Sequence, residues 1–196
     1  MYDNLIFRWF RSLLGGQIRY FVSGGAPLNV EIKDFLTVVF SAPIFEAYGM
    51  TEAAGCLTCT AIWDREGNNV GGVLPCARMQ LRDCPSLNFF TESNPPVGEI
   101  YIKGNSVFKG YYKQPDLTKQ IIDEEGWLRV GDIGVLNPNG SVSLVDRVQD
   151  MKKLQNGQFI SPQKLESVYQ EAPLVKQIYV DINSACNYVI AVAVLN

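Results

Sequence analysis

The sequence predicts an α/β segment, then a β-rich region, then a small α+β unit that begins near Asp146. Three observations support this fold class. Residues 17–48 place a helical pattern between two strand-like runs, and residues 97–147 contain alternating apolar runs separated by turn residues. Residues 147–196 return to a mixture of helical and strand-like patterns. We therefore expect two domains, residues 1–146 and 147–196.

The α/β segment begins with a strand over residues 17–25 that ends in a glycine turn. A helix over residues 29–40 follows, with Asn29 as its N-cap, and residues 43–48 form the next strand. A strand, a helix and a strand at this spacing predict a parallel βαβ unit. The spacing of apolar residues along this helix puts Ile32, Phe35, Leu36 and Val39 on one face.

The first residues of the chain predict an amphipathic helix rather than a signal peptide, because an acid and two arginines interrupt the apolar stretch. Its apolar face carries Leu5, Ile6, Trp9, Phe10 and Leu13. We expect this face to pack on the sheet, and anchoring to a membrane surface is the alternative.

The β-rich region has four elements with clear signals. Residues 97–104 alternate and predict a strand, and residues 115–122 predict a short helix. Two further strands surround Asn139-Gly140, a pair of residues that suits a tight hairpin turn.

The C-terminal unit begins with a hairpin over residues 151–160 that turns at Asn156-Gly157. A helix follows with Ser161 as its N-cap and a proline at its first position. Two strand-like runs, residues 175–182 and 187–196, complete the sequence.

Composition excludes several functional classes. The 196 residues are 47% hydrophobic and 19% charged, which indicates a folded protein, and the net charge of -3 argues against nucleic-acid binding. The chain has no histidine, so catalytic triads and imidazole bases are excluded. Five cysteines do not pair evenly. Cys56, Cys59, Cys76 and Cys84 allow a zinc site, but we expect small buried side chains in or beside strands.

Two stretches follow the ends of the predicted parallel strands, where such sheets bind ligands. One is "SGGAP", residues 23–27, and the other is "YGMTE", residues 48–52. Adjacent hydroxyl and carboxylate groups at Thr51 and Glu52 suit a phosphate and Mg²⁺. Asp132, between two glycines after a strand, suits the hydroxyls of a ribose, although a turn-forming aspartate is the alternative.

Taken together and in order, the motifs resemble those of the acyl-adenylate-forming superfamily, within it the long-chain acyl-CoA synthetases. They are "SGGAP", "YGMTEAAG", "GGVLPC", "GEIYIKG", "FKGYYKQPDLT", "GWLRVGDIG" and "DRVQDMKKLQNGQFISPQKLE". The resemblance implies that residues 1–146 are the C-terminal part of a large AMP-binding domain and that residues 147–196 begin a small mobile domain. It also implies ATP-dependent activation of a long-chain fatty acid and its transfer to CoA, with Mg²⁺. Another acyl or aryl acid ligase, or a non-catalytic nucleotide- or acyl-binding relative, is the alternative.

The resemblance also assigns roles to individual residues. The residues assigned to adenine are Gly25, Ala26, Pro27, Glu46, Ala47, Tyr48 and Gly49, with the Tyr48 ring stacking on the base. Thr51 is assigned to the phosphates, and Glu52 to Mg²⁺. Asp132 and Arg147 are assigned to the ribose. Lys153 and Gly157 are assigned to the hairpin that approaches CoA, where Gly157 leaves room for the pantetheine arm.

Three features depart from the family pattern. A phosphate-wrapping loop ending in Pro-Lys-Gly and the family's catalytic lysine have no counterpart, and Gln149 stands where the junction usually has Lys or Asp. We expect a segment of a longer enzyme that has little adenylation activity alone and leaves apolar surface uncovered. We expect the protein on the cytoplasmic side of a membrane. The candidate membranes are those of the endoplasmic reticulum and the peroxisome and the mitochondrial outer membrane, and attachment would use regions that this sequence does not contain.

Overall fold

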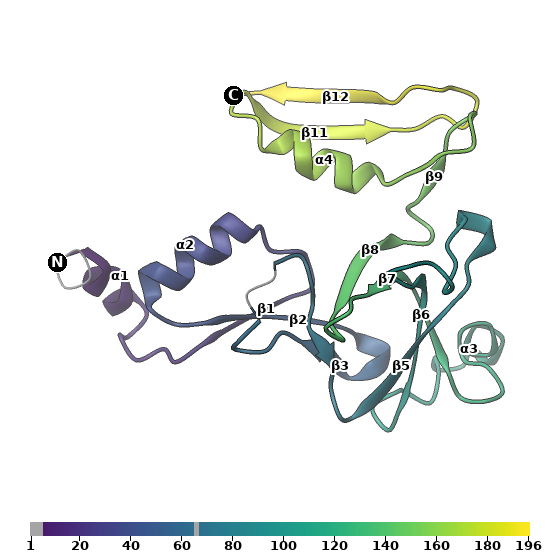
Figure 1. The fold of residues 1–196 in the computed structure, drawn as a ribbon, viewed down its shortest axis with the longest axis horizontal. Helices are drawn as coiled ribbons and strands as arrows, with labels where there is room; N and C mark the ends of the chain where they lie inside the picture. The colour runs from purple at the N-terminus through teal and green to yellow at the C-terminus, as the bar shows by residue number, and fades with distance from the viewer. Residues whose placement is uncertain (1–5, 65–66) are drawn as a thin grey trace. The chain divides into compact units, whose positions relative to one another are not determined.

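The computed structural model describes residues 6–64 and 67–196 (Figure 1). These residues form two compact units. Within the described residues, the first unit comprises residues 6–64, 67–80, 101–130 and 135–144, and the second comprises residues 81–100, 131–134 and 145–196. The expected domain division after residue 146 stays a prediction.

The first unit contains the predicted βαβ unit. Strand β1 (Phe21–Gly24) runs parallel to β2 (Ile44–Met50), and helix α2 (Val30–Phe40) connects them. Asn29 caps α2, because its side-chain oxygen accepts hydrogen bonds from the amides of Glu31 and Ile32. The parallel pairing and the cap confirm the prediction.

A tight turn after β2 leads into an antiparallel extension of the same sheet. Strand β3 (Gly55–Cys59) pairs with β2, and β4 (Gly72–Val73) pairs with β3, so the order is β1-β2-β3-β4. The register between β2 and β3 shifts by one residue at Tyr48, which is the mark of a β-bulge. This sheet carries both stretches that the sequence assigned to ligand binding.

A second four-stranded sheet has the order β5-β6-β7-β8. Its strands are β5 (Ala77–Arg82), β6 (Val97–Gly104), β7 (Leu128–Leu136) and β8 (Val142–Arg147), and helix α3 (Pro115–Ile121) lies between β6 and β7 in the chain. Ile102, Leu128 and Val142 are almost completely buried. Gly140 at the β7–β8 turn has a positive φ of 82°, as expected for the Asn139-Gly140 hairpin.

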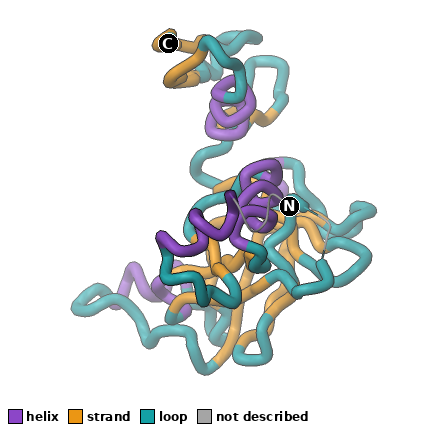
Figure 2. Tube along the Cα trace, turned by 90° about the vertical axis from the view of Figure 1, so that its left-hand side faces the viewer, coloured by secondary structure: helices purple, strands orange, loops and turns teal. Residues whose placement is uncertain are grey.

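The C-terminal part of the second unit has the predicted hairpin, helix and strand pair. These are β9 (Lys152–Lys153), β10 (Phe159–Ile160), α4 (Pro162–Gln170), β11 (Val175–Asp181) and β12 (Ile190–Leu195). Helix α4 lies along the β11–β12 hairpin (Figure 1 and Figure 2). Leu154, Val180 and Ile182 form the hydrophobic core of this part of the second unit. The Glu166 carboxylate of α4 accepts a hydrogen bond from the Val180 amide of β11.

The N-terminal helix α1 (Arg8–Leu13) is shorter and more exposed than expected. Trp9 is 60% exposed and Leu13 is 61% exposed, so the expectation that this face packs on the sheet is wrong. Leu5 of the predicted face lies outside the described residues. Within residues 6–64 and 67–196, no helix combines the length and hydropathy that a membrane span requires.

Candidate functional site

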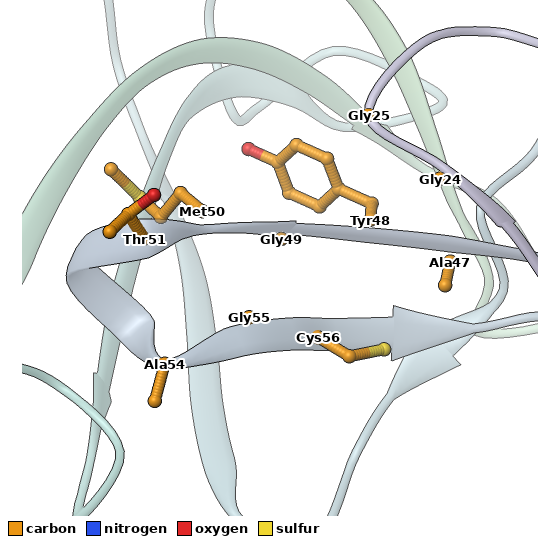
Figure 3. A pocket seen from close by; sticks show the side chains of 10 residues that line it. All are labelled: Gly24, Gly25, Ala47, Tyr48, Gly49, Met50, Thr51, Ala54, Gly55 and Cys56. Carbon is orange, nitrogen blue, oxygen red and sulfur yellow. The ribbon is translucent and has the colours of Figure 1, made fainter.

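The first unit has a cleft of about 540 Å³ where β1 ends and β2 turns into β3 (Figure 3). Short residues and exposed backbone form most of its surface. The residues that line it are Gly24, Gly25, Ala47, Tyr48, Gly49, Met50, Thr51, Ala54, Gly55 and Cys56. Such a surface suits a flat ligand, because glycines let backbone atoms approach it closely.

Glycines shape this cleft for steric reasons. A Cβ atom on Gly24 would lie 2.8 Å from the Ala47 carbonyl oxygen, and one on Gly49 would lie 1.6 Å from the Gly55 carbonyl oxygen. Neither backbone can yield without separating strands, so any larger residue would disturb the sheet. Gly25 differs, because it has open space around it but a φ of +88°. The turn after β1 therefore depends on its left-handed conformation.

The cleft brings together five of the residues predicted from the sequence: Gly25, Ala47, Tyr48, Gly49 and Thr51. The Tyr48 ring rises from β2 on the side where Gly24 and Gly25 lie, and the Thr51 side chain stands at the far end of the strand (Figure 3). Four other predicted residues, Ala26, Pro27, Glu46 and Glu52, are outside the cleft lining.

The Glu46 side chain is held by helix α2. Its Oε1 lies 2.8 Å from the Lys33 Nζ, and both side chains are largely buried, at 12% and 15% exposure. The Glu46 amide donates a hydrogen bond to the Thr60 hydroxyl. The Glu46 carbonyl oxygen accepts a hydrogen bond from the Thr60 amide at 2.9 Å. The carboxylate thus serves as a tie between β2 and α2, and the backbone of Glu46 is bonded to Thr60.

The Glu52 side chain is held from a distant part of the same unit. The Tyr111 hydroxyl donates a hydrogen bond to Glu52 Oε1 at 2.6 Å, and the Phe108 amide donates to the Glu52 carbonyl oxygen at 2.8 Å. The hydrogen bond to Glu52 raises the pKa of Tyr111 above its usual value. Sequence reasoning missed Tyr111, although the motif that contains it, "FKGYYKQPDLT", was among those compared with the family.

In the second unit, Asp132 on β7 and Arg147 at the end of β8 lie close together. The Arg147 Nε is 3.6 Å from Asp132 Oδ1, with side-chain exposures of 64% and 16%. The Val148 amide donates to the Gly131 carbonyl oxygen at 2.8 Å, which ties the two segments together. The structure therefore brings these two predicted residues into one ion pair.

The β9–β10 hairpin carries Lys153 and Gly157, the two remaining predicted residues. Both are exposed, and the Lys153 Nζ lies 5.3 Å from the centre of the Phe159 ring. Gly157 has a φ of +89°, and a Cβ atom there would reach only the end of the Lys153 side chain, at 4.0 Å. The hairpin turn alone therefore explains a glycine at this position, and its assigned role toward CoA stays a prediction.

The cysteines differ from the expectation of small buried side chains. Cys84 is buried, but Cys56 and Cys76 are exposed, so the expectation is wrong for those two. Partial burial raises the pKa of Cys56, and the nearby Cys59 and Cys76 thiols raise it further. Among the described residues, no group of three or more His, Cys, Asp or Glu side chains is arranged to hold a metal ion.

A parallel β1–β2 pair with a glycine turn and a tyrosine-lined cleft at its end defines a candidate nucleotide-binding protein. A family model described as "AMP-binding enzyme" matches residues 5–112, more than half of the sequence. The chain belongs to the family of AMP-binding enzymes.

Curated relatives with similar sequences are long-chain acid ligases. The mouse long-chain-fatty-acid–CoA ligase 5 is 38% identical over 99% of this chain. The peroxisomal long chain acyl-CoA synthetase 7 of Arabidopsis thaliana is 35% identical over 97% of this chain. The chain spans only 28% and 27% of the lengths of these two relatives.

Solved structures with a similar fold include a domain of a carboxylic acid reductase and a coenzyme A synthetase. The A domain of a carboxylic acid reductase from Segniliparus rugosus, in complex with AMP and a co-purified carboxylic acid, matches 96% of this chain with a TM-score of 0.80 and 34% identity. This chain covers 29% of that protein. The O-succinylbenzoate coenzyme A synthetase of Bacillus subtilis, in complex with AMP, matches 94% of this chain with a TM-score of 0.76 and 25% identity, and 39% of its own length is covered.

Proposed function

We propose that these residues serve an AMP-forming long-chain fatty acid–CoA ligase, in which they bind ATP. The relatives named as long-chain ligases support the substrate class, since they match almost the whole chain at 35–38% identity. The observation that carries the proposal is the glycine-lined cleft beside the Tyr48 ring, at the carboxyl end of a parallel strand pair.

In this proposal the adenine lies flat in the cleft. The Tyr48 ring stacks on the base, and the backbone of Gly25 and Ala47 borders it. Ala26 and Pro27 contribute through the course of the turn rather than through their side chains. Glu46 contributes by fixing the position of β2 beside the cleft, because its carboxylate is paired with Lys33 and its backbone is bonded to Thr60.

Thr51 and Glu52 face the phosphates. The exposed Thr51 hydroxyl donates to a phosphate oxygen. The Glu52 carboxylate fits Mg²⁺ by chemistry, because a hard cation prefers oxygen ligands and Tyr111 occupies only one of the two carboxylate oxygens. Bound Mg²⁺ would neutralise charge on the polyphosphate.

Asp132 accepts hydrogen bonds from the ribose hydroxyls, and Arg147, whose Nε lies 3.6 Å from Asp132 Oδ1, helps to hold that carboxylate in place. Lys153 and Gly157 lie on the hairpin that we assign to the approach of the CoA arm. Exposure of both residues is consistent with that role.

The chemistry needs no histidine. The fatty acid carboxylate attacks the α-phosphorus of ATP, the bond to pyrophosphate breaks, and an acyl-adenylate forms. The CoA thiol then displaces AMP to give the thioester. Because the acid is already an anionic nucleophile, the protein's task is to position the two anions and to stabilise charge.

A second candidate is a ligase for another acyl or aryl acid. It is favoured by the solved structures that match, since they include an O-succinylbenzoate synthetase and a carboxylic acid reductase. Both candidates share the adenylate site and differ in the acid. For location, the name of the Arabidopsis relative supports a peroxisome, and this stays a prediction for this chain.

Stable acyl-adenylate mimics test the proposal. Calorimetry would compare palmitoyl-, acetyl- and benzoyl-sulfamoyl adenosine as ligands of this chain. We expect the palmitoyl compound to bind best, and Tyr48→Ala and Asp132→Asn to weaken it about tenfold each, the equivalent of one lost polar or stacking contact. Asp150→Asn, in the same unit as Asp132, is the matched control and should bind normally.

The outcomes separate the candidates. A preference for the benzoyl compound would favour the aryl acid ligase. Tight binding that neither Tyr48→Ala nor Asp132→Asn reduces would contradict the proposed site.

A further inference from the structure

The loop that precedes α3 makes two contacts with one residue of the candidate site. Tyr111 donates its hydroxyl proton to Glu52 Oε1 at 2.6 Å, and Phe108 donates its amide to the Glu52 carbonyl oxygen at 2.8 Å. The side chain and the backbone of Glu52 are thus held by the same loop, 59 residues away from Tyr111 in the sequence.

Contacts within the loop and with helix α3 place Tyr111. Its amide donates to the Thr118 hydroxyl at 2.9 Å, and its ring packs edge-on against Phe108 with centroids 4.9 Å apart. A Cβ atom on Gly110 would lie 2.5 Å from the Thr118 side chain, and Gly110 has a φ of +137°. Because these contacts do not involve Glu52, Tyr111 offers the carboxylate a fixed partner.

A fixed partner decides how the Glu52 carboxylate is oriented. A carboxylate has two oxygens and can rotate about its terminal bond, and one short hydrogen bond removes that freedom. The second oxygen then has a defined direction for a cation. Groups that orient a metal-ligating side chain in this way typically change metal affinity 10- to 100-fold.

We propose that Tyr111 is a positioning residue that orients the Glu52 carboxylate for the cation bound to ATP. This inference rests on the proposed function, because it assumes that Glu52 holds the cation. The competing explanation is that Tyr111 only ties its loop to the sheet, in which case any loss on substitution would not depend on metal.

The experiment uses Mn²⁺ in place of Mg²⁺, since carboxylates bind both ions and Mn²⁺ has a paramagnetic signal. Electron paramagnetic resonance of free Mn²⁺, with ATP present, gives its affinity for the complex. We expect Tyr111→Phe to weaken Mn²⁺ binding about tenfold, the lower end of the usual range. AMP affinity measured without metal should not change.

Three further variants sharpen the test. Tyr112→Phe is the matched control, because Tyr112 is the neighbouring residue and is 85% exposed, and it should behave like the unsubstituted chain. Glu52→Gln should lose at least as much Mn²⁺ affinity as Tyr111→Phe. The double variant Tyr111→Phe/Glu52→Gln should lose no more Mn²⁺ affinity than Glu52→Gln alone, because Tyr111 acts through Glu52.

Each outcome bears on one claim. If Tyr111→Phe binds Mn²⁺ as tightly as the unsubstituted chain does, the positioning role of Tyr111 is overturned. The role is also overturned if Tyr111→Phe loses affinity for AMP without metal by the same factor as it loses affinity for Mn²⁺. If the unsubstituted chain binds neither AMP nor Mn²⁺ with ATP, the proposed function fails, and this inference fails with it.

Discussion

Single residues decide whether the cleft can exist, and Gly49 shows this most clearly. It sits where β2 and β3 approach so closely that a methyl group would overlap a backbone oxygen of the partner strand. Gly25, by contrast, is required for its backbone conformation alone. The sequence shows both as glycines in a turn or strand, but only the structure separates the steric reason from the conformational one.

Gly49→Ala should destabilise the first unit by about 3 kcal/mol or more, because the new Cβ would lie 1.6 Å from the Gly55 oxygen and the strands would have to separate. Urea unfolding followed by circular dichroism measures this loss. Gly140→Ala is the control, since Gly140 has a positive φ but open space, and should cost about 1–2 kcal/mol. Equal losses in the two variants would show that the overlap is relieved at little cost.

Asp83 in the second unit is a carboxyl group whose protonation should weaken the fold. Its Oδ1 accepts hydrogen bonds from the Thr91 amide and hydroxyl, which lower the pKa of Asp83. A lowered pKa in the folded state stabilises the fold above the unfolded value of about 3.9. That stabilisation is lost as the pH falls through the folded value.

We therefore expect the Thr91 amide resonance to titrate with a midpoint below about 3.9 in an NMR experiment. Thr91→Ala removes the hydroxyl donor and should move the Asp83 midpoint upward, as followed at the Asp83 carboxyl carbon. A midpoint at or above the usual value in the unsubstituted chain would refute the account of this loop.

At the scale of elements, local signals predicted the helices and strands well. Period-2 alternation over residues 97–104 and the caps at Asn29 and Ser161 act within a few residues, so the sequence contains them directly. The parallel β1–β2 pairing also followed from a local spacing. These elements therefore needed no knowledge of tertiary contacts.

Other features depended on contacts between distant residues and could not be predicted. The Lys33–Glu46 pair and the Tyr111–Glu52 hydrogen bond join separate elements, and no local pattern indicates them. The exposure of single residues on the apolar face of α2 could not be predicted either, since Phe35 is 64% exposed while Val39 is 3% exposed. Periodicity identifies a face but does not say what covers it.

The cap of α2 gives a prediction at this scale. Asn29→Ala should cost about 1 kcal/mol, because two amides at the start of the helix lose their acceptor. Asn29→Asp should restore the cap, since aspartate is an equally good acceptor there. Chemical denaturation of both variants measures the difference, and a loss in Asn29→Asp as large as in Asn29→Ala would rule out capping as the cause.

For the whole molecule, a fold shared with AMP-binding enzymes carries the cleft in which we propose that a nucleoside binds. A solved carboxylic acid reductase domain in complex with AMP matches 96% of this chain. This structural match supports the fold independently of the sequence motifs. The first unit by itself presents Gly25, Tyr48 and Thr51 on one cleft. The central claim is that adenine binds there.

Photolabelling with 8-azido-ATP followed by peptide mapping tests that claim most directly, because the reactive group is attached to the adenine ring. The account predicts cross-links within residues 24–27 or 44–50, and excess ATP should prevent them. Cross-links confined to other segments, or labelling of these segments that ATP does not block, would contradict it.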